Sequence, residues 1–146
     1  VSFGLLDFTE NYSLELKNSV VMETGGMKGR RKEMIRQELH EILGPAFGVQ
    51  KIHSEYGMTE LLSQAYSKGD SLFKCPPWMK ASCRNTNDPL SVNKTSGGLN
   101  IIDLANIHSC SFIATQDLGK IHENGDFEVL GRFDTSDIRG CNLMVL

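Results

Sequence analysis

Hydrophobic and polar positions along the first half of the chain alternate in the manner of strands and helices that follow one another. Residues 20–23 form a short, mostly apolar run that enters a Thr-Gly-Gly turn, which predicts a buried strand. Apolar residues then recur at helical spacing over 34–43, and Gly44-Pro45 is typical of the end of a helix. Residues 49–52 predict a second strand and 61–66 a short helix. This order predicts a parallel α/β layer.

The second half has a different pattern, that of antiparallel strands. Strand-like runs occur at 79–84, 100–104, 111–115 and 127–130, and the glycines at 119, 125 and 131 predict turns between them. Residues 85–98 are rich in Asn, Ser, Thr, Gly and Pro, which predicts a loop or hairpin tip. The predicted fold class is therefore α/β, a partial parallel layer followed by an antiparallel β subdomain, or α+β for the chain as a whole. We expect an α/β segment at 1–68 and a β-rich subdomain at 69–146.

Composition narrows the class of protein. The 146 residues carry a formal net charge of −3, with 40% hydrophobic and 23% charged residues, which is ordinary for a globular chain of one domain. This charge balance argues against a nucleic-acid partner. No apolar run approaches the roughly 18–20 residues of a membrane span. The four cysteines lack zinc-site spacing, so we expect reduced thiols and a cytoplasmic protein.

Two segments near the predicted strand ends can carry chemistry. Gly25-Gly26 allows the backbone to approach a flat ligand closely, although a plain strand-to-helix turn is the commoner role. The segment Tyr56-Gly57-Met58-Thr59-Glu60 offers an aromatic face, a hydroxyl and a carboxylate suited to a divalent cation. The competing interpretation is a helix N-cap at Thr59 with Tyr56 in the core.

Two further segments lie in the second half. Asp117, expected in a turn between strands, can accept hydrogen bonds from a ribose diol, or can be an ordinary turn residue. For Arg132 and Asp134, the plain interpretation is a surface ion pair without a further role. Cys141 follows Arg139, whose charge favours a thiolate, although a buried structural cysteine is the commoner case.

The order of these segments resembles the adenylate-forming acyl-activating superfamily. The resemblance rests on Gly-Gly after a strand, then Tyr-Gly-x-Thr-Glu at 56–60, Thr-x-Asp-x-Gly at 115–119 and Gly-Arg-x-Asp at 131–134. Within that superfamily, residues 22–30 and 138–143 are similar to the acyl-protein synthetases of the bacterial luminescence pathway, the LuxE type. The resemblance covers the chain from about residue 19 to its last residue.

The resemblance implies an ATP- and Mg²⁺-dependent enzyme that converts a fatty acid, or another carboxylic acid, to an acyl-adenylate and then transfers the acyl group to a thiol. It implies that Gly25 and Gly26 line the adenine pocket and that Tyr56, with Gly57 beside it, stacks on the base. The roles that it implies for the next two residues are contact with the α-phosphate for Thr59 and a share in holding Mg²⁺ for Glu60.

For the second half, the resemblance implies that Asp117 binds the ribose hydroxyls with help from Arg132, and that Asp134 lies at a hinge. LuxE-type proteins carry the acyl group on a cysteine near the C-terminus. The resemblance therefore makes Cys141 the candidate acyl carrier and implies an acyl reductase as a partner. A homodimer is a further expectation.

Two departures from the family pattern limit these expectations. Gln116 stands where the superfamily usually has glycine, and neither a phosphate loop upstream of Gly25 nor a lid domain with a catalytic lysine is present in the chain. We therefore expect the C-terminal portion of a longer enzyme, and no adenylation activity from the 146 residues alone. Two alternatives stay open: a ligase that delivers an acyl or aryl acid to coenzyme A, and a non-catalytic interaction module.

Overall fold

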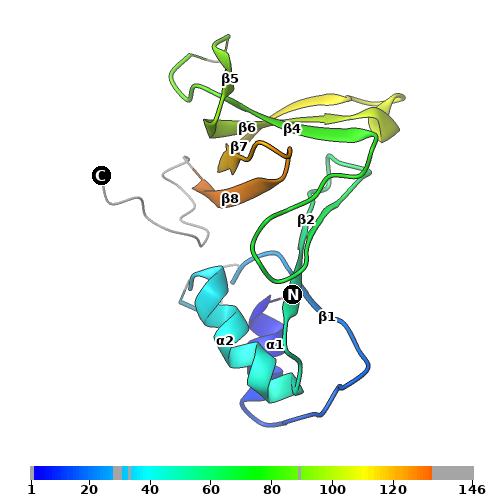
Figure 1. The fold of residues 1–146 in the computed structure, drawn as a ribbon, viewed down its shortest axis with the longest axis vertical. Coiled ribbons are helices and arrows are strands. Elements are labelled where there is room, and N and C mark those ends of the chain that lie inside the picture. Colours follow the sequence, from blue (N-terminus) through cyan, green and yellow to red (C-terminus); the bar gives the residue numbers. More distant parts are fainter. Residues whose placement is uncertain (1, 28–30, 33, 89, 133–146) are drawn as a thin grey trace.

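The fold, seen in a computed structural model that describes residues 2–27, 31–32, 34–88 and 90–132, has helices at one end and a β-sheet at the other (Figure 1). The helices are α1 (Ser2–Thr9), α2 (Arg36–Phe47) and the 3-10 turn η1 (Leu104–Asn106). A three-stranded sheet contains β1 (Val21–Thr24), β2 (Ile52–Tyr56) and β3 (Ala65–Ser67). A five-stranded sheet contains β4 (Met79–Arg84), β5 (Val92–Lys94), β6 (Ser96–Asp103), β7 (Phe112–Ile121) and β8 (Phe127–Arg132).

Strand pairing confirms the predicted fold class. β1 and β2 are parallel, with Val21 opposite Ile52 and Thr24 opposite Glu55, while β3 runs antiparallel to β2. Every pair in the second sheet is antiparallel, in the spatial order β5-β4-β6-β7-β8. The parallel layer is thus a single βαβ unit, and the antiparallel sheet follows it. The expected division of the chain between residues 68 and 69 stays a prediction.

One hydrophobic core lies between the two long helices and the first sheet. It is formed by Leu6 of α1, Val21 of β1, Ile52 of β2, Met27, and the α2 residues Leu39, Leu43 and Phe47. The α2 side chains recur at helical spacing, which is why the periodicity of 34–43 located this helix. Helix α1 was not anticipated from the sequence. None of the helices in the described part of the chain is long and apolar enough to cross a bilayer.

A second core joins the two sheets. Tyr56, Leu61, Ala65 and Phe73 from the first part pack with buried residues of the second sheet, namely Met79, Ala81, Cys83, Leu99, Ile101 and Phe127. The Phe73 and Phe127 rings lie 5.5 Å apart between centroids, and the two residues exchange backbone hydrogen bonds. The second core fixes β2 against the antiparallel sheet, so side chains from both can meet.

Glu23 lies at the centre of a buried polar cluster beneath the helices. Its side chain is 3% exposed and accepts hydrogen bonds from Ser2 Oγ at 3.2 Å and Arg36 Nε at 3.0 Å. His40 Nε2 lies 3.7 Å from the same carboxylate and 3.3 Å from Ser54 Oγ. Burial opposes ionisation, but hydrogen bonds with His40, Ser54 and Arg36 outweigh it and hold the pKa of Glu23 below its usual range.

The predicted end of α2 at Gly44-Pro45 is wrong. The helix continues to Phe47, which is 4% exposed in the first core, and Pro45 lies within its last turn. Gly48 ends it instead, in the left-handed conformation at φ +62°, with its N–H directed to the carbonyls of Gly44 and Pro45. Burial of the Phe47 ring in the first core therefore determines the last turn of α2, and Pro45 does not end the helix.

Two predictions around β2 are also wrong. The strand spans 52–56 and not 49–52, because the N–H of Val49 bonds to the Gly44 carbonyl as part of the helix end. Residues 61–66 form no helix: the chain turns and enters β3, where Tyr66 exchanges backbone hydrogen bonds with Lys74. Thr59 accordingly caps no helix, contrary to one interpretation of the sequence.

In the second sheet, β4 spans 79–84 as predicted, while β6, β7 and β8 are longer than the sequence predicted. β6 begins at Ser96, inside the expected loop 85–98, which also contains β5, and β7 continues to Ile121 through the expected turn at Gly119. A Cβ atom on Gly119 would lie 2.5 Å from Leu99 Cδ2, so close packing requires glycine there. Gly125, at φ +85°, does occupy the turn between β7 and β8.

Candidate functional site

The Thr-Gln-Asp segment forms a β-bulge in β7. Asn100 pairs with Ala114 and Gly98 with Leu118, so residues 115–117 lie opposite Leu99 alone. Thr115 Oγ1 donates to the Leu99 carbonyl at 3.0 Å and accepts from the Asp117 N–H at 3.1 Å. The predicted turn at Asp117 is therefore wrong, and the bulge directs this side chain toward the first sheet.

Arg84, which the sequence did not single out, stabilises the bulge through hydrogen bonds from its side chain. This residue is 8% exposed, and its guanidinium donates to the carbonyls of Leu99 and Thr115 and to Asn100 Oδ1. Carbonyl groups that the bulge removes from the ladder thereby receive hydrogen bonds. A Cβ on Gly98 would lie 2.9 Å from the guanidinium carbon, so Gly98 makes room for the arginine.

Tyr56 connects β2 to the bulge. Its hydroxyl donates to Asp117 Oδ2 at 2.7 Å, across the junction of the two sheets. The residue is 8% exposed, and its ring packs edge-on against Phe127 at 5.3 Å between centroids and beside Phe73 at 5.9 Å. Burial and the Asp117 charge raise the pKa of Tyr56, so the hydroxyl stays protonated and donates. The ring thus has the core position that the sequence left open, and stacking on a base stays a prediction.

Arg132 lies opposite Asp117 in the β7–β8 register. Its Nε atom is 3.8 Å from Asp117 Oδ1, and its Nη2 donates to Gln116 Oε1 at 2.8 Å. The Asp117 side chain is 17% exposed and that of Arg132 is 32% exposed. The structure therefore brings Tyr56, Asp117 and Arg132 together, and Gln116 accepts a hydrogen bond from the arginine.

Gly25 lies at the same edge of the first sheet as Tyr56. Thr24 pairs with Glu55 in the parallel register of β1 and β2. Gly25 and Tyr56 are the residues that directly follow this pair. Gly25 has φ +77°, as a glycine turn requires, and its carbonyl accepts a hydrogen bond from Ser2 Oγ at 3.0 Å. Gly25 is exposed and Gly26 half-buried. Ligands of open α/β sheets bind at the carboxyl ends of parallel strands, which is where both glycines lie.

Thr59 and Glu60 lie in the exposed turn that follows β2. No helix begins there, so the expected set of free helical N–H groups is not formed. Gly57 is exposed, and a Cβ atom on it would lie 3.1 Å from Gln64 Cγ. Within the described residues, no three His, Cys, Asp or Glu side chains gather into a possible metal site. Glu60 by itself fits Mg²⁺ only as one ligand beside phosphate oxygens and water, a common arrangement for this ion.

Two predicted site residues, Asp134 and Cys141, lie outside the described residues. Of the other cysteines, Cys75, Cys83 and Cys110 carry free thiols. Burial raises the pKa of the Cys75 thiol to about 11, which makes it a poor nucleophile at neutral pH.

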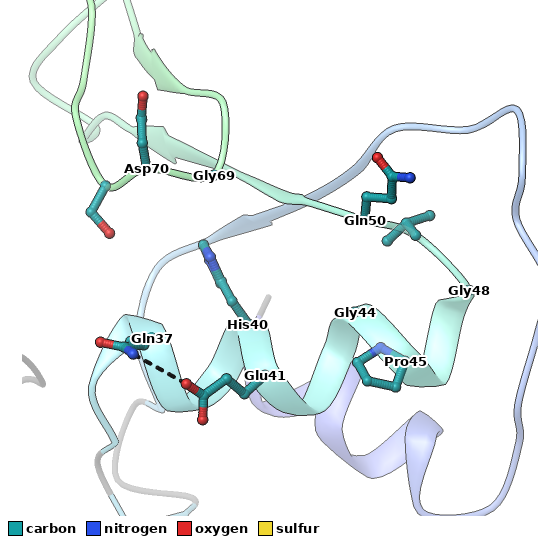
Figure 2. A pocket seen from close by; sticks show the side chains of 11 residues that line it. Gln37, His40, Glu41, Gly44, Pro45, Gly48, Gln50, Gly69 and Asp70 are labelled. Atoms are coloured by element: carbon teal, nitrogen blue, oxygen red, sulfur yellow. Dashed lines mark hydrogen bonds between the residues drawn. The ribbon is translucent and has the colours of Figure 1, made fainter.

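A separate hollow of about 820 Å³ lies between α2 and the turn at 69–71 (Figure 2). His40 projects into it from α2 toward Gly69 and Asp70, and Gln37 donates to Glu41 on the rim at 3.1 Å. Of the predicted nucleotide-binding residues that the structure describes, none lines this hollow.

Comparison with known proteins gives a likeness in fold. No family model matches the sequence, and no curated protein matches it. A point mutant of coronafacic acid ligase from Pectobacterium brasiliense superposes with a TM-score of 0.63 at 22% identity, over 91% of this chain and 28% of that one. O-succinylbenzoate coenzyme A synthetase from Bacillus subtilis, solved with ATP and magnesium, gives 0.59 at 17% identity, over 91% and 32%.

A benzoate CoA ligase from Burkholderia xenovorans gives a TM-score of 0.52 at 19% identity, over 77% of this chain and 25% of that one. This chain spans about a third or less of each of these three proteins. At 17–22% identity, the likeness is one of fold. The described chain thus has the fold of one part of these larger ligases.

Proposed function

We propose that the chain forms the ribose- and base-binding part of a longer adenylate-forming enzyme, which activates a carboxylic acid with ATP. The observation that carries the proposal is the meeting of Tyr56, Asp117 and Arg132, three residues from separate motifs, at one junction between the sheets. The resemblance of the sequence to the adenylate-forming superfamily implied these three residues, and the fold that the chain shares with parts of the three ligases supports the proposal.

The carboxylate of Asp117 fits a ribose diol. An ionised carboxylate accepts about four hydrogen bonds. Asp117 accepts one from the Tyr56 hydroxyl at 2.7 Å, and Arg132 Nε lies 3.8 Å from its other oxygen. Its side chain is 17% exposed, so acceptor capacity faces solvent. Gly25 and Gly26, at the adjacent strand end, would lie beside the base, and Thr59 near the α-phosphate.

Mg²⁺ would be held by Glu60 together with phosphate oxygens, and would supply charge neutralisation there. In the proposed first step a carboxylate oxygen bonds to the α-phosphorus of ATP, and pyrophosphate leaves with the electrons of the broken P–O bond. In the second step a thiolate attacks the acyl carbonyl and AMP leaves. The remaining donors to the phosphates must come from parts of the enzyme that this chain does not contain.

The acyl acceptor separates two versions of the proposal. The resemblance of residues 138–143 to LuxE-type synthetases favours a fatty acid as substrate and Cys141 as acceptor. Two of the solved neighbours are named for coenzyme A, which favours that thiol as the alternative. A hydroxylamine-labile acyl group that is lost in Cys141→Ser supports the first, and coenzyme A-dependent turnover that Cys141→Ser leaves unchanged supports the second.

The test of the proposed function is carboxylic-acid-dependent ATP–pyrophosphate exchange by the full-length protein that contains this chain. We expect exchange that requires Mg²⁺ and falls at least about tenfold in Asp117→Ala, since a charged acceptor is lost. The isolated 146 residues should show none. Absence of exchange from the full-length protein with every acid tested would favour the non-catalytic interaction module.

A further inference from the structure

The turn after β2, residues 57–64, is held from outside by the second sheet. It contains Thr59 and Glu60, and no helix follows to fix it. Within the turn, the Leu61 N–H bonds to the Met58 carbonyl at 3.0 Å, and the Leu61 side chain is 4% exposed in the second core. Two polar side chains, Asp103 at the end of β6 and Asn106 in the following turn η1, bond to the residues around Leu61.

Asp103 is fully buried and binds the turn at Ser63. Its Oδ2 accepts from the Ser63 N–H at 2.8 Å, and its Oδ1 accepts from the Ser63 hydroxyl at 2.7 Å and the Ala105 N–H at 3.0 Å. Trp78 Nε1 donates to the same hydroxyl at 2.9 Å. Burial alone would raise the pKa of Asp103, but the hydrogen bonds that it accepts outweigh burial and keep it below the usual range.

Asn106 uses both ends of its amide on the same turn. This residue is 3% exposed; its Oδ1 accepts from the Leu62 N–H at 2.9 Å, and its Nδ2 donates to the carbonyl of Glu60. Asp103 and Asn106 together form what we call the clamp, and it reaches the backbone of Glu60 itself. This contact is not local in sequence, because Asn106 lies 46 residues after Glu60.

We propose that Asp103 and Asn106 are positioning residues that hold Thr59 and Glu60 for the phosphates and Mg²⁺, an inference that rests on the proposed function. Without the clamp, the turn would keep the buried Leu61 as an anchor but lose the fixed orientation of the Glu60 backbone. The second sheet thus contributes to the chemistry in two places, through the bulge at Asp117 and through this clamp.

The first arm of the test measures amide hydrogen exchange in the 146-residue chain. Asn106→Ala should speed exchange of the Leu62 amide by about tenfold, because that N–H loses its acceptor. Asn106→Asp keeps an acceptor for Leu62 but has no donor for the Glu60 carbonyl, so it should preserve Leu62 protection. Asp126→Asn is the control, at another buried aspartate that contacts Asn124 of its own turn and Lys74, and it should leave exchange of the Leu62 amide unchanged. Unchanged Leu62 exchange in Asn106→Ala overturns the clamp.

The second arm measures ATP–pyrophosphate exchange by the full-length protein against Mg²⁺ concentration. Both Asn106→Ala and Asn106→Asp should raise the Mg²⁺ concentration for half-maximal rate at least about threefold, as expected for loss of one modest hydrogen bond. A merely structural role would lower the rate without moving this midpoint, so an unmoved midpoint overturns the positioning role. No exchange from the unmutated protein overturns the proposed function and with it the role of the turn, whereas the amide arm still reports on the clamp itself.

Discussion

Two carboxylates with arginine partners, Glu23 under the helices and Asp117 between the sheets, differ in how completely the protein satisfies them. Both oxygens of Glu23 receive hydrogen bonds, from Ser2 and Arg36, and its side chain is 3% exposed. Asp117 is 17% exposed and has one short hydrogen bond, from Tyr56. A buried carboxylate with its partners in place serves the fold, while a partly exposed one with spare acceptor capacity can serve a ligand.

The largest effect that the comparison predicts is on folding. Glu23→Ala leaves Arg36 and His40 near an empty position, so the free energy of unfolding should fall by about 3–5 kcal/mol. Urea denaturation measures it. Glu55→Ala, at a half-buried glutamate of the neighbouring strand, is the matched control and should cost less than about 1 kcal/mol. Equal losses in the two variants would mean that Glu23 has no special structural role.

The second prediction concerns Asp117. Asp117→Asn should weaken binding of AMP by about 10- to 100-fold, because a charged acceptor is replaced by a neutral one, and should change stability by less than about 1 kcal/mol. NMR titration of the 146-residue chain gives the affinity, and urea denaturation the stability. A large loss of stability with unchanged affinity would place Asp117 in the same class as Glu23.

Tyr56→Phe should have an intermediate effect on both quantities. The ring stays in the core against Phe127, but the hydroxyl that orients Asp117 is lost, at about 1 kcal/mol of stability and a few-fold in AMP affinity. Tyr66→Phe, at an exposed tyrosine of β3, is the control and should change neither. If Tyr56→Phe binds AMP as tightly as the unmutated chain does, Asp117 does not need the Tyr56 hydroxyl for binding.

The smallest effect expected is the pH dependence that Glu23 contributes. Its pKa is lowered in the folded chain, so its stabilising contribution is complete above the ordinary glutamate value, about 4.3, and is lost as pH falls through the folded value. Urea midpoints between pH 7 and pH 3 should therefore fall less steeply in Glu23→Gln than in the unmutated chain. Parallel profiles would assign acid sensitivity to other groups, Asp103 among them.

The local pattern of apolar residues predicted the elements that bury a single face in a core. Helical spacing of apolar residues located α2, and the apolar run at 20–23 located β1. Prediction failed where distant contacts decide the structure. Phe47 extends α2 past Pro45, and Asn106 and Asp103 accept hydrogen bonds from the N–H groups of Leu62 and Ser63 and hold this segment as a turn.

The candidate site was predicted in the same uneven way. Motif order selected Tyr56, Asp117 and Arg132, which the fold brings together, but placed Asp117 in a turn when it lies in a bulge. Arg84 and Asn106 gave no signal, because a single arginine or asparagine is ordinary until the fold shows what it contacts.

The central claim is that Asp117 binds a ribose diol. The most direct measurement compares AMP with its 2′,3′-dideoxy analogue, by NMR titration, on the unmutated chain and on Asp117→Asn. We expect the unmutated chain to bind AMP about tenfold or more tightly than the analogue, and Asp117→Asn to bind both about equally. Equal affinity of the unmutated chain for the two nucleotides, or discrimination that survives in Asp117→Asn, would contradict it.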